Sequence, residues 1–231
     1  MSIRPSEGVT GRAFLIGTAA SLFVGVGVIY GDNVIRGSRM AQDFASPIAL
    51  LLLFVMVALL NPLIGWLRRS WYLTTSEISL VYIMALAAAT IPSMGLTSFF
   101  IPYLSGAQYY ATPENRWADL FMGHVPDWMV PQDTKAIQDF YEGNPHGTIA
   151  WDAWLPALIA WAPFLLALFL VMIAGMVILR RQWMNHERLA YPLMQPSLAM
   201  IAQEKGRLLS PLFSCLPFWI GLHSLCCWLL Y

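Results

Sequence analysis

Charged side chains are scarce in this chain. Asp, Glu, Lys and Arg make up only 11% of its 231 residues, whereas 58% are apolar. Soluble domains carry about 25% charged residues, so this composition predicts an integral membrane protein. The formal net charge is zero, and it gives no reason to expect binding to nucleic acid.

The sequence also lacks the common motifs of enzyme and cofactor chemistry. It contains no Gly-rich phosphate loop, no G-x-S-x-G nucleophile elbow and no C-x-x-C pair. His186 and Glu187 begin like the zinc-binding motif H-E-x-x-H, but Ala190 stands where the second histidine is required. We therefore expect no enzymatic activity, no bound metal and no cofactor, and a membrane-embedded enzyme is the least favoured alternative.

Long uncharged apolar runs are abundant instead. A helix needs about 20 apolar residues to cross the hydrocarbon layer of a membrane, and five runs reach that length. We expect an all-α membrane protein with about five transmembrane helices, at about residues 13–31, 44–67, 78–104, 153–179 and 208–231. The segment 105–152 then forms a loop on one side of the membrane, and 180–207 forms a charged joint on the other.

Basic residues are divided unequally between the two sides. If each run crosses once, one side carries two basic residues at the amino end, two between the second and third runs and five in the joint 180–207, which is nine of thirteen. By the positive-inside rule this side is cytoplasmic. We expect a multi-pass protein of the cytoplasmic (inner) membrane, with a cytoplasmic amino terminus and an extracytoplasmic loop.

The third run is interrupted by prolines and glycines. Pro92 and Gly95 lie in the stretch from Ile91 to Ser98, and Pro102 follows. Proline removes a backbone donor and clashes with the carbonyl four residues earlier, and hydrocarbon cannot satisfy the groups that are freed. We expect a broken or re-entrant segment of the kind that forms substrate sites in secondary transporters, with a plain proline kink as the alternative.

Polar or irregular positions near such breaks are candidates for lining a substrate cavity. Asn61 precedes Pro62 near the cytoplasmic end of the second run, where its amide can bond the carbonyls that the proline frees, or contact substrate. The cavity candidates are Asn61, Pro92, Ser93, Gly95 and Thr97.

The five runs hold no Asp, Glu, Lys or Arg in their interior, although ion-coupled transporters often bury such a group. His223 is the only histidine within a run. It is the candidate for carrying a coupled proton, and hydrogen-bonded packing is the favoured alternative.

Small residues recur along the first run. Gly17, Ser21 and Gly25 are spaced four apart, and Gly27 precedes Gly31 by four. Faces of small residues let a second helix approach closely, so we expect these five positions to lie at helix contacts.

Two short amphipathic helices are predicted in the loop 105–152. A Thr-Pro cap begins one at Thr112, and Gly123 ends it. Apolar residues at i, i+3 and i+4 predict a second from Asp133 to Glu142. Between residues 114 and 142 six acids face two bases. We expect a folded cap on the membrane surface or over a cavity, in the position of a gate or lid.

Two stretches resemble the oligopeptide transporter (OPT) superfamily. The family's opening helix is similar to residues 9–31, VTGRAFLIGTAASLFVGVGVIYG. Its loop of an acidic residue, a Leu, an aromatic-Pro pair and small residues is similar to residues 186–200, HERLAYPLMQPSLAM, with Glu187, Leu189, Tyr191 and Pro192 as the family markers. The segment between resembles an uncharacterised bacterial branch of OPT-like proteins more than the well-known peptide carriers.

The resemblance implies a proton-coupled secondary transporter that moves small peptides or metal chelates across the membrane. Members of the superfamily have many more than five spans, and this chain ends in CCWLLY within an apolar run. We therefore expect the N-terminal part of a longer polytopic protein, with the lipid bilayer, further membrane subunits or copies of itself as partners. The alternative is a non-transporting membrane subunit of a larger complex.

Overall fold

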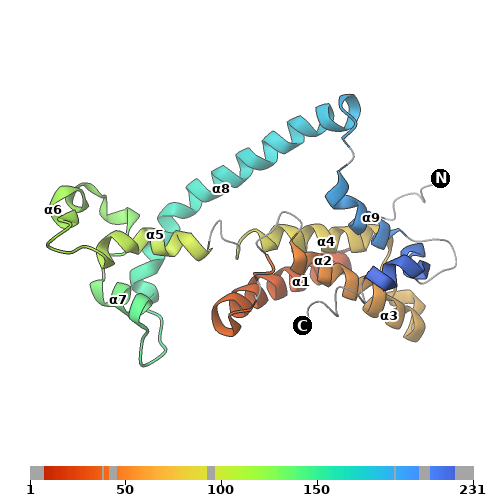
Figure 1. Cartoon of the computed structure of the whole chain (residues 1–231), viewed down its shortest axis with the longest axis horizontal. Coiled ribbons are helices and arrows are strands. Elements are labelled where there is room, and N and C mark those ends of the chain that lie inside the picture. The colour runs from red at the N-terminus through yellow and green to blue at the C-terminus, as the bar shows by residue number, and fades with distance from the viewer. Residues whose placement is uncertain are drawn as a thin grey trace. The chain divides into compact units, whose positions relative to one another are not determined.

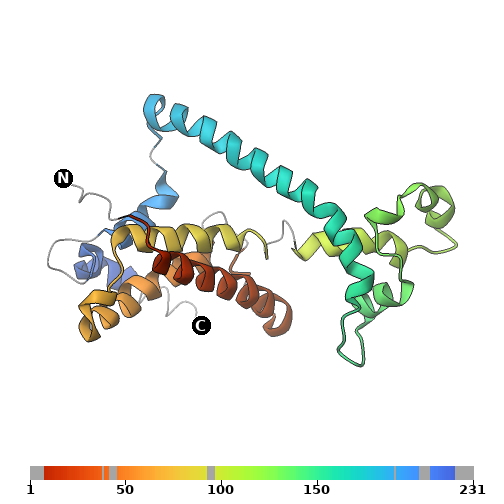
Figure 2. The same ribbon diagram turned by 180° about the vertical axis from the view of Figure 1, so that it is seen from behind.

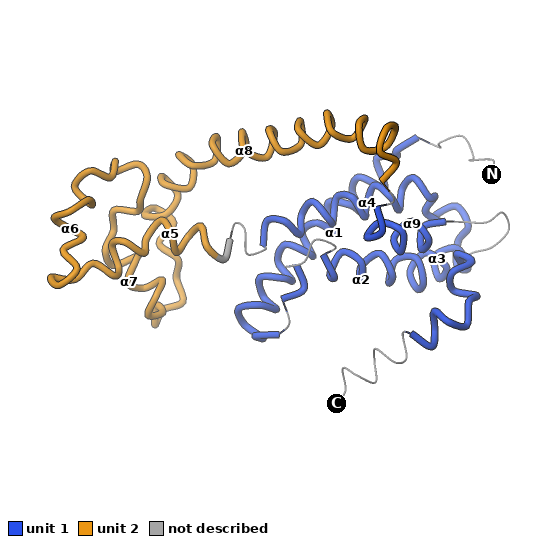
Figure 3. The backbone as a smooth tube through the Cα atoms, turned by 45° about the horizontal axis from the view of Figure 1, so that its top comes forward, with its two compact units in different colours: residues 1–97, 191–231 blue, residues 98–190 orange. Residues whose placement is uncertain are grey.

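The computed structural model describes residues 8–37, 39–41, 46–92, 97–189, 191–202 and 209–221. The chain divides into two compact units (Figure 3). The first unit comprises residues 1–97 and 191–231, and the second comprises residues 98–190. The regular elements within the described ranges are helices and helical turns, as the composition and the apolar runs predicted.

Five helices of seven residues or more lie in the described part of the first unit, where α1 and α4 run side by side (Figures 1 and 2). The helices are α1 (Gly11–Tyr30), α2 (Pro47–Val55), α3 (Asn61–Leu67), α4 (Thr75–Ala89) and α9 (Gln195–Ile201). The chain also forms π turns at Gly31–Ile35 and Met56–Leu60, and 3-10 turns at Arg69–Trp71, Pro192–Met194 and Pro211–Ser214.

One face of α1 is buried in the first unit. Its buried residues recur every three or four positions and therefore share that face. They are Ala13, Gly17, Ala20, Val24 and Val28. The opposite face carries large exposed apolar side chains, among them Leu22 and Phe23. A helix that is apolar all round is suited to lipid or to further membrane helices.

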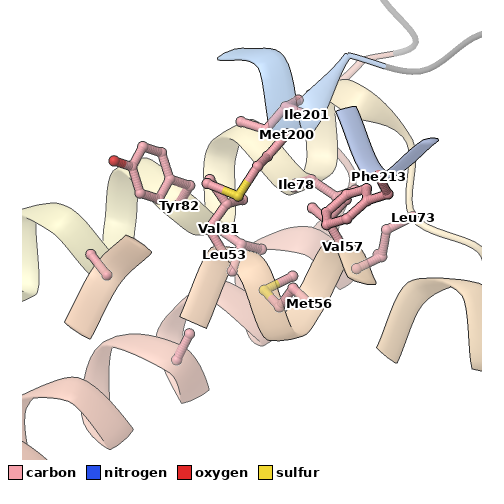
Figure 4. Close-up of a cluster of buried hydrophobic side chains, with 12 residues drawn as sticks. Leu53, Met56, Val57, Leu73, Ile78, Val81, Tyr82, Met200, Ile201 and Phe213 are labelled. Atoms are coloured by element: carbon pink, nitrogen blue, oxygen red, sulfur yellow. The ribbon is translucent and has the colours of Figure 1, made fainter. Parts of the chain in front are cut away.

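The core of the first unit gathers side chains from α2, α4 and α9 (Figure 4). Its main members are Leu53, Met56, Val57, Leu73, Ile78, Val81, Tyr82, Met200, Ile201 and Phe213. At its edge, Ser197 Oγ donates a hydrogen bond of 2.9 Å to Tyr82 Oη, across 115 positions of sequence. The short α9 thus completes a core begun by the first ninety residues.

A π turn accommodates Pro62 within the second apolar run. Pro62 has no backbone N–H, and in a regular helix its ring clashes with the carbonyl of residue 58. The chain widens instead, and the Asn61 N–H bonds to the carbonyl of Met56, five residues earlier. Pro47–Leu67 is therefore one continuous helix in spite of the proline.

The second unit is held together largely by aromatic side chains. Its helices are α5 (Thr97–Tyr109), α6 (Trp117–Leu120), α7 (Thr134–Glu142) and α8 (Trp151–Arg181), with 3-10 turns at Met122–His124 and Asp127–Met129 and a π turn at Gln182–His186. Trp161 of α8 donates from Nε1 to the Met129 carbonyl at 3.0 Å, and its ring lies 5.9 Å from that of Phe100 on α5. Phe140 of α7 packs on Trp154 of α8 at 5.4 Å.

Helix α8 has 31 residues and is therefore about 46 Å long. The hydrocarbon layer is about 30 Å thick, so a helix of this length crosses it with tilt or extends beyond it. Only Trp154 and Ala157 are buried on α8, and apolar side chains cover the rest of its circumference. Arg180 and Arg181 end it.

Three helices in the described residues are long and apolar enough to span a membrane: Gly11–Ile35, Pro47–Leu67 and Trp151–Asn185. They cover the first, second and fourth apolar runs. The structure thus supports three spanning helices where the sequence predicted about five.

The third run contains two short helices where a broken segment was expected, and only part of the fifth run lies in the described residues. The third contains α4, with 15 residues, which ends at Ala89 and is followed by a turn, and α5, with 13 residues, which begins at Thr97. Each is shorter than the 20 residues or so that a crossing needs. In the fifth run, residues 209–221 form the 3-10 turn Pro211–Ser214 and a short helical segment at 216–221.

The helix predicted from Thr112 to Gly123 is reduced to α6, a single turn. The Thr112 hydroxyl accepts from the Asn115 N–H, and the Asn115 side chain accepts from the Thr112 N–H, which closes a separate turn before α6. Arg116 then adopts a left-handed conformation, with φ of 54°, that no helix can pass through. Side-chain bonds to the backbone therefore replaced helix formation.

Candidate functional site

The residues predicted to line a substrate cavity do not meet at one place. Asn61 bonds to Leu73, just before α4, whereas the buried Pro92 follows the end of that helix. A helix of 15 residues is about 22 Å long, so Asn61 and Pro92 cannot line one small cavity. Ser93 and Gly95 lie outside the described residues, and of Thr97 the structure describes the backbone, at the start of α5.

Asn61 is buried, and both ends of its amide are occupied. Its Nδ2 donates to the Leu73 carbonyl at 3.1 Å, and its Oδ1 accepts from the Leu73 N–H at 2.8 Å. The partner is thus the backbone entering α4, and not the carbonyls freed by Pro62. Because buried backbone groups must be paired, Asn61 fixes the connection between α3 and α4.

The first unit contains an ion pair between the partly exposed Arg12 and the buried Glu77, which the sequence analysis did not predict. Glu77 is 1% exposed, and Arg12 Nη2 donates to its two carboxylate oxygens at 2.9 and 3.0 Å. Thr10 Oγ1 donates to the same carboxylate. Glu77 also forms a capping box with Thr74, whose N–H donates to Oε2 at 2.9 Å. One carboxylate therefore joins the start of α1 to the start of α4.

The surroundings of Glu77 favour its ionised form. Burial by itself raises the pKa of this carboxyl, but hydrogen bonds from Thr10 and the Thr74 backbone, with the bonds and charge of Arg12, lower it below 4.5. At neutral pH Glu77 therefore holds its charge and acts as a clamp between the two helices.

The small residues predicted to pack lie at different depths. A Cβ at Gly17 would collide with the Met84 side chain, so here the absence of a side chain lets α4 approach. Ser21 is half-buried, and no atom lies within 4 Å of a Cβ added at Gly25, Gly27 or Gly31. Steps of four residues advance about 40° around a helix, so the series moves off the buried face after Gly17.

The family-marker residues lie on exposed chain between α8 and α9. Glu187 and Leu189 follow the π turn that ends α8, and Tyr191, with φ of 43°, precedes the 3-10 turn that begins at Pro192. His223 lies outside the described residues.

The clearest candidate site in the described residues is a groove of about 380 Å³ in the second unit, which we call the α5–α7 groove. Its lining residues are Gln108 and Tyr109 at the end of α5, and Thr134, Ile137, Gln138 and Glu142 along one face of α7. Ligand sites for small molecules begin at about 300 Å³, so the volume suits a small ligand.

Caps at both ends fix α7 beside the groove. At its start the Asp133 carboxylate accepts from the N–H groups of Lys135 and Ala136 at 2.9 and 3.3 Å. At its end Gly143 has φ of 91°, a conformation that favours glycine, so Glu142 is the last helical residue.

A tyrosine stack holds α7 against α5. The rings of Tyr109 and Tyr141 are stacked with centroids 4.1 Å apart, and Tyr141 Oη donates to the Pro102 carbonyl at 3.2 Å. A second, smaller groove of about 250 Å³ is lined by Phe99, Pro102, Tyr103, Tyr110 and Tyr141. Each groove thus has one tyrosine of the stack in its wall.

Glu142 is the charged residue among those that line the α5–α7 groove. Glu142 accepts from Tyr109 Oη at 3.3 Å and from Gln138 Nε2 at 3.1 Å. Burial, and then the charge of Glu142, raise the pKa of Tyr109 above 10.0. Gln108 Oε1 is shielded and has no partner among the described residues, a situation that costs about 1–3 kcal/mol.

Part of the groove was visible in the sequence. Thr134, Gln138 and Glu142 are spaced four apart on a helix that the sequence predicted, so they share a face. The end of α5 packs beside this face because Tyr109 stacks on Tyr141. No local sequence pattern predicts that contact. Among the described residues, no group of three or more His, Cys, Asp or Glu side chains is placed to hold a metal ion.

Comparison with known proteins gives a family but no activity. No curated protein and no solved structure matches the chain. None of the comparisons links it to the OPT superfamily. A family model described as "Family of unknown function (DUF6785)" matches residues 4–226, nearly the whole sequence, and the chain therefore belongs to the DUF6785 family.

Proposed function

We propose that this chain is the N-terminal part of a polytopic secondary transporter, similar to the OPT superfamily, that moves small peptides or metal chelates across the cytoplasmic membrane. The proposal extends the three candidate spans to a larger set of crossings, with the amino terminus in the cytoplasm. The short and interrupted elements of the third run are then a pair of half-helices, and the loop 105–152 is a gate.

The observation that carries the proposal is the break between α4 and α5. It falls within the 36 uncharged residues 78–113, where prolines and glycines predict an interrupted helix. Both flanking helices are too short to cross alone, and the buried Pro92 lies in the break. Broken helices at membrane depth occur where the freed backbone lines a cavity or is buried in protein, and transporters use them for substrate.

Uptake by proteoliposomes tests the proposal. Full-length protein is reconstituted and supplied with a panel of labelled di- and tripeptides and metal chelates, with and without a proton gradient. We expect gradient-dependent uptake of at least one class. Folded protein that transports none of the panel would contradict the proposal.

A proline variant ties transport to the break. We expect Pro92→Ala to lower uptake about tenfold, because hinge positions control the rate of conformational steps. Pro163→Ala is the matched control, because Pro163 lies on an exposed part of α8. Equal loss in both variants would indicate a general folding defect instead.

A non-transporting subunit of a larger complex is the second candidate. It is favoured by the apolar surface of α8 between residues 164 and 179, where no residue is buried and which partner helices can cover as well as lipid. This alternative predicts copurification with other membrane proteins at fixed stoichiometry. A stable, solitary monomer that transports substrate would refute it.

A further inference from the structure

We propose that the α5–α7 groove binds a small organic cation, a primary ammonium group attached to an apolar body. This inference concerns binding alone and does not depend on transport. It follows from the carboxylate, the helix ends, the aromatic wall and the charge of the surrounding loop.

The carboxylate of Glu142 supplies the anionic partner. Its two oxygens each accept one hydrogen bond, from Tyr109 Oη and Gln138 Nε2. A carboxylate offers about four acceptor positions, so about two remain for donors of an ammonium group. The six lining residues include no Lys or Arg, and the groove therefore contains no internal cation to compete.

Two helix ends converge on the same point. α5 ends at Tyr109 and α7 ends at Glu142, and these two side chains are hydrogen-bonded to each other. The C-terminal end of a helix carries a partial negative charge from its unpaired carbonyls, and it favours cations. Both dipoles therefore act in the same direction as the carboxylate.

The remaining wall suits an apolar body. Tyr109 is held by its stack on Tyr141, and the buried Ile137 of α7 lines the groove. A ring that is fixed in this way offers apolar contact without a further loss of side-chain entropy. A simple metal ion gains nothing from these apolar contacts, which is why the structure favours an organic ammonium ion.

The surrounding loop strengthens this selectivity. From residue 114 to residue 142, six acidic residues outnumber two basic ones. A field of one sign raises the local concentration of ions of the opposite sign and repels anions. Anionic ligands of similar size should therefore be excluded.

Calorimetry on the purified full-length protein tests the inference with 2-phenylethylammonium as the probe. We expect saturable binding of this cation. Its neutral isostere 2-phenylethanol and the anion 3-phenylpropionate should bind at least about tenfold more weakly, since charge-assisted bonds are about twice as strong as neutral ones. Equal binding of the cation and the alcohol would overturn the proposal.

Three variants locate the site. Glu142→Gln should weaken binding of the cation about tenfold. Asp139→Asn removes the same charge from the same helix, but outside the groove. The affinity of this variant for the cation should stay within about twofold of the wild type. Unchanged binding in Glu142→Gln, or equal loss in both variants, would contradict the assignment.

The third variant, Gln138→Glu, tests the proposal independently in case Glu142→Gln does not fold. It adds a carboxylate to the lining and should tighten binding about threefold, because a second anionic group increases the attraction for the ammonium ion. No tightening in a protein with normal tryptophan fluorescence would overturn the proposal even if Glu142→Gln does not fold.

Discussion

Asn61 gives Leu73 the two hydrogen bonds that a neighbouring strand would otherwise supply. Replacing it with Ala leaves a buried N–H and a buried carbonyl unpaired, so we expect unfolding to become easier by about 1–3 kcal/mol. Denaturant unfolding in detergent, followed by tryptophan fluorescence, measures this. Asn33→Ala is the control, because Asn33 is exposed and its Nδ2 donates to the nearby Ile29 carbonyl, and it should change stability by less than about 0.5 kcal/mol. Similar losses in the two variants would show that Asn61 has no special role.

Glu77 makes the stability of the first unit depend on pH. Its pKa in the folded protein is lowered below 4.5, so the unfolded state binds protons more readily than the folded state. The stabilisation is complete above about pH 4.5 and is lost as the pH falls through the lowered value. We expect the melting temperature to fall on acidification below that point.

The variant Glu77→Gln isolates this effect. It should melt at lower temperature than the wild type at neutral pH and show a weaker dependence on acid, because the titrating group is gone. Glu187→Gln, on exposed chain, should keep the wild-type profile. An unchanged acid dependence in Glu77→Gln would assign the effect to another carboxyl.

At the scale of the element, the contact between α1 and α4 depends on Gly17. Gly17→Leu would drive its side chain into Met84, and overpacking of this kind costs about 1–3 kcal/mol. Gly25→Leu on the same helix meets no neighbour among the described residues and should be neutral or slightly stabilising. Thermal unfolding of both variants checks the pair. A greater loss at Gly25 would place the contact on the other face of α1.

Helices with strong local signals were the ones that sequence predicted well. α8 follows an uncharged run, and α7 lies between Asp133 and Gly143, which cap it as their residue types predict. α6 was predicted too long, because the reciprocal bonds of Thr112 and Asn115 compete with helix formation.

Contacts between distant residues account for what sequence could not predict. The spacing of Thr74 and Glu77 is that of a capping box, and it was available as a local signal. Arg12 and Thr10 complete this site only because α1 pairs with α4. Arg12 and Glu77 are about 65 residues apart in the sequence, so no local pattern predicts their contact. The α5–α7 groove depends in the same way on Tyr109 meeting Tyr141.

At the scale of the whole molecule, the prediction that can be measured most directly is topology. We expect a cysteine at Asp133 to react with an impermeant maleimide from outside the cell, and one at Gln182 to react only in inverted vesicles, since α8 separates them. Both are introduced into a background in which the three native cysteines are replaced by Ser. Labelling of both from the same side would rule out α8 as a span.

The hydrogen bond between Tyr82 and Ser197 has a consequence for synthesis on the ribosome. Tyr82 emerges 115 residues before its partner, and the second unit is made in between. At 5–20 residues per second the delay is roughly 6 to 23 seconds. Throughout this interval the apolar surface of α4 that α9 later covers has no partner from its own chain, so we expect nascent chains stopped before residue 195 to depend on the insertion machinery or a chaperone for protection.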